Sequence, residues 1–399
     1  MSEFSLDAEF PQATRGDWLK RVDAVLKGGD FAARLVSTTC DELRIEPLYG
    51  QAHGPRAARP GPSPWTVFQR ADHPDPASAN VQALDDLSNG VTGLALVTAH
   101  AHGARGFGLD PGQLARVLLN VELHAIALRA DGAGSIPLAD LIARRPIDPE
   151  RMKIGFSALS AEDAVSLNAQ GFAGPLMEAD GRVWHEKGAS DAQELGATLA
   201  DGVARLRSLD RLNDAHLTRA VGVTLAAHQD MFPALAKFRA MRLLWQRVLG
   251  AAGLPEAPLK LHAETSWRMM SSLDPHTNIL RATTAVFGAS LGGADSICVL
   301  PFSLAQGLPN GFARRVARNV QSVLLEESNL WRVADPASGA GFVENLTQSL
   351  CDKAWTVFQK AEAGEWPRPD PSATASLPVI GTSAYRLPTE YPAEVEAQR

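Results

Sequence analysis

The sequence has few cysteines, and none of them is close to another in the chain. Cys40, Cys298 and Cys351 are the three cysteines among 399 residues. Because they lie far apart and form no Cys-x-x-Cys pair, the sequence indicates neither a disulfide framework nor a cysteine-ligated zinc site. No apolar run is long enough to span a membrane, and the first residues lack the apolar core of a signal peptide. We therefore expect a cytoplasmic protein.

Positive charge is also scarce. The 38 Lys and Arg residues are scattered, and against 45 Asp and Glu residues they leave a net charge of −7. A chain without a basic stripe is a poor match for nucleic acid. What the sequence does contain is apolar residues, at 45%, which is too many for a disordered chain. Its length suits one large domain or two ordinary domains.

Both ends of the chain are predicted to form arms. At the N-terminal end, residues 1–70 contain a helix that begins near Asp17 and stops at Gly28-Gly29, a short strand over 43–47, and an extended Pro- and Gly-rich stretch over 50–64. At the C-terminal end, residues 364–399 are rich in proline and are expected to be an extended arm.

Between the arms, residues 71–363 alternate short apolar runs with longer amphipathic segments, as expected for strand–helix units around a parallel sheet. The runs begin on average about 34 residues apart, close to the roughly 31 residues per unit of an eightfold barrel. We therefore predict an α/β fold, an eight-stranded (β/α)8 TIM barrel; a doubly wound open sheet is the alternative. The eight expected strands begin near Gly93, Val121, Met152, Arg182, Val221, Leu259, Ser296 and Trp331.

Histidines at the end of one expected strand suggest a metal site. His100 and His102 are two residues apart, so both imidazoles would lie on one face of a strand, and barrel sites form where strands end. His262 and Asp335, at the ends of two further expected strands, would complete the cluster. The arrangement resembles amidohydrolase-type metal barrels; the alternative is that these are polar histidines of surface loops.

Several blocks in the same order resemble a known family. The matching blocks are Ala236-Lys237-Phe238-Arg239-Ala240, Leu244-Trp245, His262-Ala263-Glu264-Thr265-Ser266, Asp274-Pro275, Leu291-Gly292-Gly293, Ala317-Arg318-Asn319, Glu326-Glu327-Ser328 and Val333-Ala334-Asp335-Pro336. They resemble the barrel domain of methylmalonyl-CoA mutase, an adenosylcobalamin-dependent isomerase. The resemblance implies an eightfold barrel whose axis, in active members, admits the pantetheine arm of an acyl-CoA.

The chain departs from the active members of that family. Their substrate-shielding tyrosine would fall within residues 58–63, which contain none, and Tyr49, Tyr385 and Tyr391 are the three tyrosines of the chain. Their Gln-Asn-Asp…Arg-Asn-Thr region has no counterpart between residues 155 and 182. Their histidine before Gly-Ala has a candidate in His185, which stands two positions closer to Gly188 than the family pattern.

The expected thioester site also carries altered residues. By resemblance, the candidate substrate-binding residues are His262, Glu264, Asp295 and Ser296. Glu264 and Asp295 stand where the family has amides, and two carboxylates near polyanionic CoA would disfavour its binding.

The family's cobalamin-binding domain has no counterpart in the sequence. The stretch Asp214-Ala215-His216 matches the start of an Asp-x-His-x-x-Gly cobalt-ligand loop, but Arg219 stands where glycine is needed. The chain is therefore most like the small, non-catalytic subunit of a heterodimeric mutase. The resemblance implies that adenosylcobalamin is on a catalytic partner subunit, which the N-terminal arm would wrap.

Two other functions stay open at this point. The chain would be an active acyl-CoA mutase if a separate chain supplied the cobalamin, with His185 and His262 as catalytic candidates. It would be a metal-dependent hydrolase if His100 and His102 hold a metal ion with Asp335.

Overall fold

The computed structural model describes residues 13–55, 57, 59–157, 159–372, 378–386, 388–389 and 391–398. Residues 1–12 of the predicted N-terminal arm and Ala58, in the stretch aligned with the family tyrosine, lie outside the described residues. The strands are β1 (Ser37–Thr38), β2 (Arg44–Ile45), β3 (Thr66–Ala71), β4 (Gly93–Leu96), β5 (Ala127–Ala130), β6 (Lys153–Phe156), β7 (Met177–Asp180), β8 (Val221–Ala227), β9 (Leu261–Thr265), β10 (Ser296–Cys298), β11 (Gly307–Pro309) and β12 (Val395–Gln398). The helices are α1 (Arg15–Leu26), α2 (Phe31–Leu35), α3 (Pro76–Ser88), α4 (Leu114–Val117), α5 (Ser135–Ala143), α6 (Ala161–Ala169), α7 (Arg182–Glu186), α8 (Asp191–Ser208), α9 (Asp214–Ala220), α10 (Met231–Ala251), α11 (Thr277–Leu291), α12 (Gly311–Ser322) and α13 (Gly341–Glu362).

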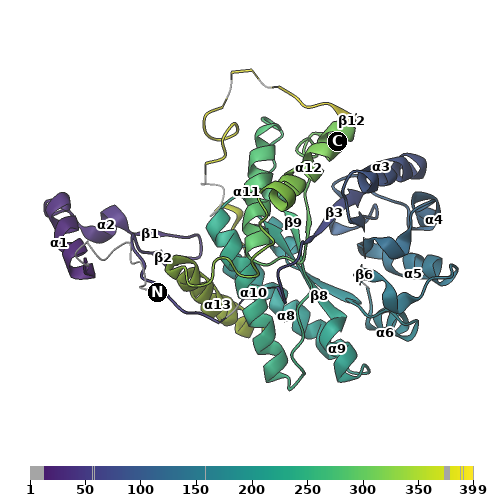
Figure 1. The fold of residues 1–399 in the computed structure, drawn as a ribbon, viewed down its shortest axis with the longest axis horizontal. Coiled ribbons are helices and arrows are strands. Elements are labelled where there is room, and N and C mark those ends of the chain that lie inside the picture. Colours follow the sequence, from purple (N-terminus) through teal and green to yellow (C-terminus); the bar gives the residue numbers. More distant parts are fainter. Residues whose placement is uncertain are drawn as a thin grey trace, which may run out of the picture.

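Eight parallel strands form a nearly closed barrel. Their order is β6-β5-β4-β3-β10-β9-β8-β7, and helices surround them (Figure 1). At the seam between the two end strands, the Phe156 amide donates to the Pro175 carbonyl over 2.8 Å. The predicted eight-stranded α/β barrel is thus confirmed, and the chain does not form the doubly wound open sheet.

Two of the predicted strands are wrong, and two barrel strands, β3 and β7, were not predicted. The run beginning at Arg182 forms helix α7, in which the His185 amide donates to the Gly181 carbonyl over 3.0 Å. Residues 331–336 form turns. The strand that begins the barrel is β3, which precedes the predicted start at residue 71. It was missed because its buried Gln69 and Arg70 interrupt the apolar pattern.

The main hydrophobic core lies between the outer face of the barrel and the helices. The α10 helix contributes Phe238, Met241 and Trp245, all buried. The long helices α8 and α13 pack so closely at Gly196 that there is no room for a side chain there. A Cβ on Gly196 would lie 2.6 Å from the Ala354 carbonyl oxygen. Among the described residues, no helix combines the length and the apolarity needed to cross a membrane.

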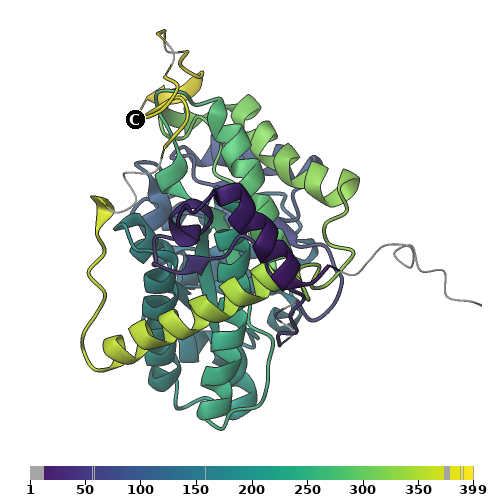
Figure 2. The same ribbon diagram turned by 90° about the vertical axis from the view of Figure 1, so that its left-hand side faces the viewer.

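The N-terminal arm has two parts. Its first part, α1 and α2, stands away from the barrel beyond α13 (Figures 1 and 2). Thr14 and Asp17 form a capping box at the start of α1, which stabilises this helix locally. The second part lies against the barrel: the Ala192 amide donates to an Asp41 carboxylate oxygen over 3.2 Å, and Tyr49 packs on Phe342.

The C-terminal segment also lies on the barrel. Trp366 stacks on Trp184 with ring centroids 5.4 Å apart, and β12 pairs antiparallel with β11. Both contacts are made within one chain, and they hold Trp366 and residues 395–398 against the barrel.

Candidate functional site

Charged side chains meet inside the carboxyl half of the barrel. Arg70 on β3 and Arg182 on α7 both face Glu264 on β9, with nitrogen–oxygen distances of 3.4 and 3.0 Å. Arg70 also bonds Asp72, and Arg182 bonds Asp180, at 2.8 and 2.9 Å. Burial alone would raise the pKa of Glu264, but Arg182 and Arg70 outweigh it and hold this pKa below its usual value. Glu264 is therefore ionised within a buried ionic network.

A second ion pair crosses the barrel beside the seam. Arg129 on β5 donates to Glu178 on β7 over 2.6 Å, and Ser157 donates to the same carboxylate over 2.7 Å. The Thr224 hydroxyl on β8 donates to Glu178 as well. Burial raises the pKa of Glu178, but Arg129 lowers it further, so the net shift is downward. This pair links β5 to β7, across the seam between β6 and β7.

At the amino end of the barrel, His262 meets Ser296 and Phe68. The His262 Nδ1 atom lies 2.7 Å from the Ser296 hydroxyl, and the Phe68 ring packs edge-on at 5.5 Å between centroids. Burial, then Arg129 and Arg182, hold the pKa of His262 well below its usual value, so the imidazole is neutral. Asp295 faces the outer helices, where its carboxylate lies 3.0 Å from Arg242.

These contacts fill the axis of the barrel. Phe68, Ala95, Ala127 and Cys298 form a small apolar cluster separate from the main core, and the ion pairs lie beside it. A cavity of about 300 Å³ remains at the amino mouth, with His262 and Ser296 in its wall. The structure brings the predicted substrate residues His262, Asp295 and Ser296 to the wall of this cavity, where Asp295 is paired with Arg242, and it places Glu264 in the ionic network.

A larger cavity, of about 650 Å³, lies at the carboxyl ends of β8 and β9. Its walls come from loops that follow the strands, from residues 37–45 of the N-terminal arm, and from Pro371 and Val379 of the C-terminal segment. TIM-barrel enzymes carry their chemistry at this end of the barrel. We call this space the carboxyl-end cavity.

Two histidines lie in the wall of the carboxyl-end cavity. His185 and His228 stack with parallel rings, 6.1 Å between centroids. The His185 Nε2 atom lies 2.7 Å from the Ser266 hydroxyl, and its Nδ1 atom lies 3.2 Å from a Glu194 oxygen. His228 lies 3.0 Å from Asp191. Lys237, fully buried, bridges Asp191 and Glu194 at 2.9 and 2.8 Å. The sequence singled out His185 as a site residue but gave no role to Ser266 and Lys237, which lie far from it in the chain, or to Glu194, which lies nine positions after it.

The residues of the expected metal cluster lie apart. His100 is exposed, and His102 lies 3.0 Å from Glu186, which also bonds Arg105. Asp335 forms an ion pair with Arg239 on α10. Within the part of the chain that the structure describes, no three His, Cys, Asp or Glu residues are placed to hold a metal ion. The expected cluster is wrong for these residues, because the predicted strand before Asp335 does not form.

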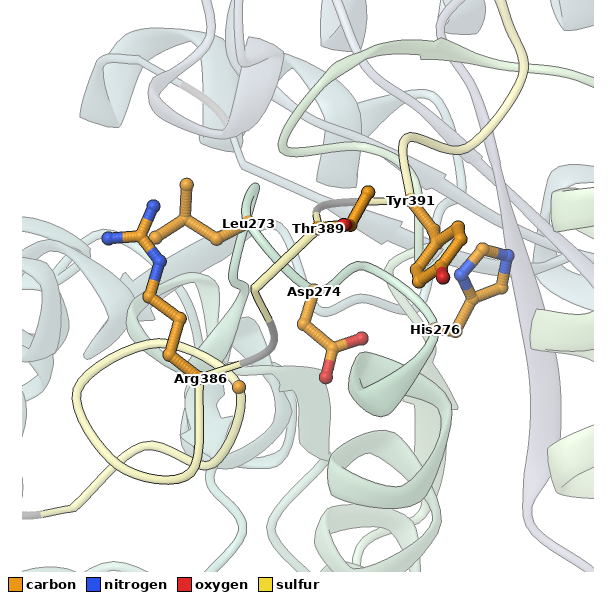
Figure 3. A pocket seen from close by; sticks show the side chains of 7 residues that line it. Leu273, Asp274, His276, Arg386, Thr389 and Tyr391 are labelled. Carbon is orange, nitrogen blue, oxygen red and sulfur yellow. The ribbon is translucent and has the colours of Figure 1, made fainter.

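The three tyrosines lie outside the barrel. Tyr49 is in the N-terminal arm, and Tyr385 and Tyr391 are in the C-terminal segment, 84% and 63% exposed. Tyr391 lines a separate cavity of about 420 Å³ with His276 (Figure 3). His216, the histidine of the Asp-x-His pattern, is an exposed residue of helix α9.

Sequence reasoning missed the arginines inside the barrel. Arg70, Arg129 and Arg182 were not singled out, since arginine in an expected strand usually faces solvent. The sequence did contain one signal. Side chains two apart in a strand lie on the same face, so Arg70 is on the same face of β3 as the apolar Phe68, and both are buried.

The chain is similar to known proteins over almost its whole length. The methylmalonyl-CoA mutase family model matches residues 176–364. The methylmalonyl-CoA mutase small subunit of Streptomyces virginiae is 37% identical over 98% of this chain and 73% of that protein. The small subunit of Propionibacterium freudenreichii subsp. shermanii is 32% identical over 90% of this chain and 63% of that protein. A probable small subunit of Mycobacterium tuberculosis (strain ATCC 25618 / H37Rv) is 37% identical over 88% of this chain, which spans 62% of its length.

The resemblance seen in the sequence and these matches agree with the barrel and its order of elements. The name of these relatives, small subunit, describes each as one part of a complex. The chain belongs to the methylmalonyl-CoA mutase family, and within that family it is a small-subunit-like protein.

Proposed function

We propose that this chain does not catalyse the mutase reaction and that it stabilises a cobalamin-dependent catalytic subunit. The observation that carries the proposal is the filled barrel axis. In active members of the family, the resemblance implies that a pantetheine arm runs along this axis. Here Arg70, Arg182 and Glu264 lie across it as a buried ionic network.

Removing this network to admit a substrate would be costly. Breaking a buried ion pair by displacing one partner costs about 3–5 kcal/mol, and Glu264 has two such partners. The positions of the tyrosines outside the barrel support the same conclusion, because an active member needs one beside the substrate radical.

The cofactor fits a partner better than this chain. His216 stands within α9, and Arg219 occupies the glycine position of the cobalt-ligand pattern. The residues present therefore do not form that loop, and we assign adenosylcobalamin to the catalytic partner. The name small subunit carried by the relatives supports an assembly of small and catalytic chains, for which a heterodimer is the simplest form.

The competing function is an active mutase assisted by a separate cobalamin-binding chain. It would use His185 and His262. The neutral His262 bonds Ser296 at the amino mouth of the barrel, and the ionic network of Arg70, Arg182 and Glu264 lies further along the axis. The filled axis favours the non-catalytic function.

The test is reconstitution. The full chain, tagged and purified from its native host, is expected to bring with it a catalytic mutase chain. Methylmalonyl-CoA and adenosylcobalamin are then added to each chain alone and to the mixture, and succinyl-CoA and the cobalt(II) resonance are measured.

Turnover is expected only where the catalytic chain is present, and the catalytic chain should lose its activity more slowly on warming when this chain is bound. Succinyl-CoA formation by this chain with a free cobalamin-binding chain would overturn the proposal. A monomer that captures no mutase chain would overturn it as well.

A further inference from the structure

Three side chains at the carboxyl end of the barrel stand in the order of an acyl-transfer triad. The Ser266 hydroxyl lies 2.7 Å from His185 Nε2, and Glu194 Oε2 lies 3.2 Å from His185 Nδ1, close to the ring but outside hydrogen-bond geometry. Nucleophile, base and orienting acid in this order are recognised by geometry, whatever the fold. We propose that Ser266, His185 and Glu194 form a hydrolytic site for small esters with an apolar acyl group.

The three residues come from three separate elements. Ser266 directly follows β9, His185 is on α7 and Glu194 is on the first turns of α8. All three are buried, with Glu194 completely so. Their meeting is therefore a product of the fold, and nothing in the ionic network of the barrel axis requires it.

The orienting acid is itself held firmly. Glu194 Oε2 accepts from Lys237 over 2.8 Å, and Glu194 Oε1 accepts from the Ala226 amide over 2.9 Å. Burial raises the pKa of Glu194, but Lys237 and His185 together outweigh it, so the net shift is downward and the group is ionised. An ionised carboxylate beside Nδ1 favours the tautomer in which Nε2 accepts the serine proton.

The base is neutral. Burial lowers the pKa of His185, and Glu194 only partly offsets this, while Lys237 and Arg268 lower it further. The stacked His228 is the other titratable ring that faces it. A neutral imidazole near pH 7 is the form that takes a proton from serine.

A suitable space adjoins the nucleophile. Ser266 and His185 both line the carboxyl-end cavity of about 650 Å³. Ile45, Phe232 and Phe342 give it an apolar wall, and Arg268 adds a positive charge. Apolar walls with a few polar groups are typical of small-molecule sites. The acyl group would lie on the apolar wall, with its carbonyl toward Arg268.

The chemistry balances without a cofactor. The Ser266 oxygen forms a bond to the carbonyl carbon, its proton passes to His185 Nε2, and the carbon–oxygen bond to the alcohol breaks as that alcohol takes the proton. Water then attacks the acyl-serine, gives a proton to His185, and releases the carboxylic acid while the proton returns to Ser266.

The first experiment labels the nucleophile. The full chain is incubated with a small alkyl fluorophosphonate, in which a serine oxygen replaces fluoride at phosphorus, and the labelled peptide is identified by mass spectrometry. We expect one label, at Ser266. Ser290 is the matched control: it is also 2% exposed, it bonds the Phe287 carbonyl, and it has no base beside it among the described residues.

The second experiment measures hydrolysis of p-nitrophenyl butyrate. Ser266→Ala and His185→Asn are each expected to lower kcat/KM by about 100-fold, while Ser290→Ala keeps the wild-type rate. Glu194 is a positioning residue. Without its charge the pKa of His185 falls, so Glu194→Gln should move the rise of activity with pH toward lower pH, a shift that a purely structural role would not produce.

Circular dichroism confirms that each variant is folded before its rate is compared. No label at Ser266 in the wild-type chain, or hydrolysis that survives in folded Ser266→Ala, would overturn the proposal. Either result leaves the reconstitution test of the mutase partner unaffected, because that test does not use the carboxyl-end cavity.

Discussion

Arg182 Nη1 lies 3.0 Å from Glu264 Oε2 inside the barrel, where both side chains are almost fully buried. The arginine comes from a short helix after β7, and the glutamate is the next-to-last residue of β9. Because Arg70 faces the same carboxylate oxygen, one glutamate is shared by two guanidinium groups, each of which also pairs with an aspartate, Asp72 or Asp180.

Glu264→Gln tests the strength of this network. The substitution leaves Arg70 and Arg182 without their shared charge, so we expect the free energy of unfolding to fall by about 3–5 kcal/mol, measured by urea titration. The matched control is Arg207→Ala, which breaks the exposed pair with Glu362 and should cost about 1 kcal/mol or less. Equal stability of the two variants would show that the buried network contributes nothing.

Glu186 makes stability depend on pH. Burial raises its pKa, but Arg105 and His102 lower it more strongly, to about 2 from an ordinary 4.5. A depressed carboxylate pKa adds stability above pH 4.5 that is lost as the pH falls toward 2. In Glu186→Gln, the urea midpoint should therefore fall less steeply than in the wild type as the pH drops through this window. The control is Glu150→Gln at an exposed position, which should follow the wild-type curve. If Glu186→Gln follows it as well, the contacts of Glu186 do not make stability depend on pH.

Gly196 fixes the approach of α8 to α13. A methyl group there would meet the Ala354 carbonyl oxygen at 2.6 Å and Val357 at the same distance, so Gly196→Ala should destabilise the protein by about 1–3 kcal/mol. Gly250, in α10, faces open space, and Gly250→Ala should stabilise by about 0.5–1 kcal/mol. Melting temperatures from calorimetry compare the two variants. If both substitutions change the melting temperature in the same direction, the close packing at Gly196 is contradicted.

The first part of the N-terminal arm is expected to bind the partner subunit. Val25 on α1 is 78% exposed, and no residue of α1 is buried, so this helix has apolar surface to bury elsewhere. Deleting residues 1–36 should abolish co-purification of the catalytic chain and leave the helical circular dichroism and melting temperature of the barrel unchanged.

A longer deletion, of residues 1–60, provides the comparison. It also removes Asp41, which bonds the Ala192 amide, and Tyr49, which packs on Phe342. The melting temperature should therefore fall in this variant alone. Normal partner binding after the shorter deletion would show that α1 and α2 have another role.

The sequence by itself determined the barrel and the family. Strands such as β8 and β9 are short runs in which every residue is buried. Blocks such as His262 to Ser266 follow one another in the same order as in the mutase family. Such features can be predicted from the sequence, because apolar periodicity and the order of motifs can be read without knowing which residues are in contact.

Only the tertiary structure decided what fills the barrel and what faces its carboxyl end. Arg182 was expected to begin a strand and instead begins α7, whose short turn brings it to Glu264. Asp335 was placed with the histidines and instead pairs with Arg239. Ser266, 81 positions after His185, and Glu194, nine positions after it, both lie against the His185 ring. A charged residue in a sequence has the same propensity whether it pairs or faces water, so its partner is set only when the strands close into a barrel.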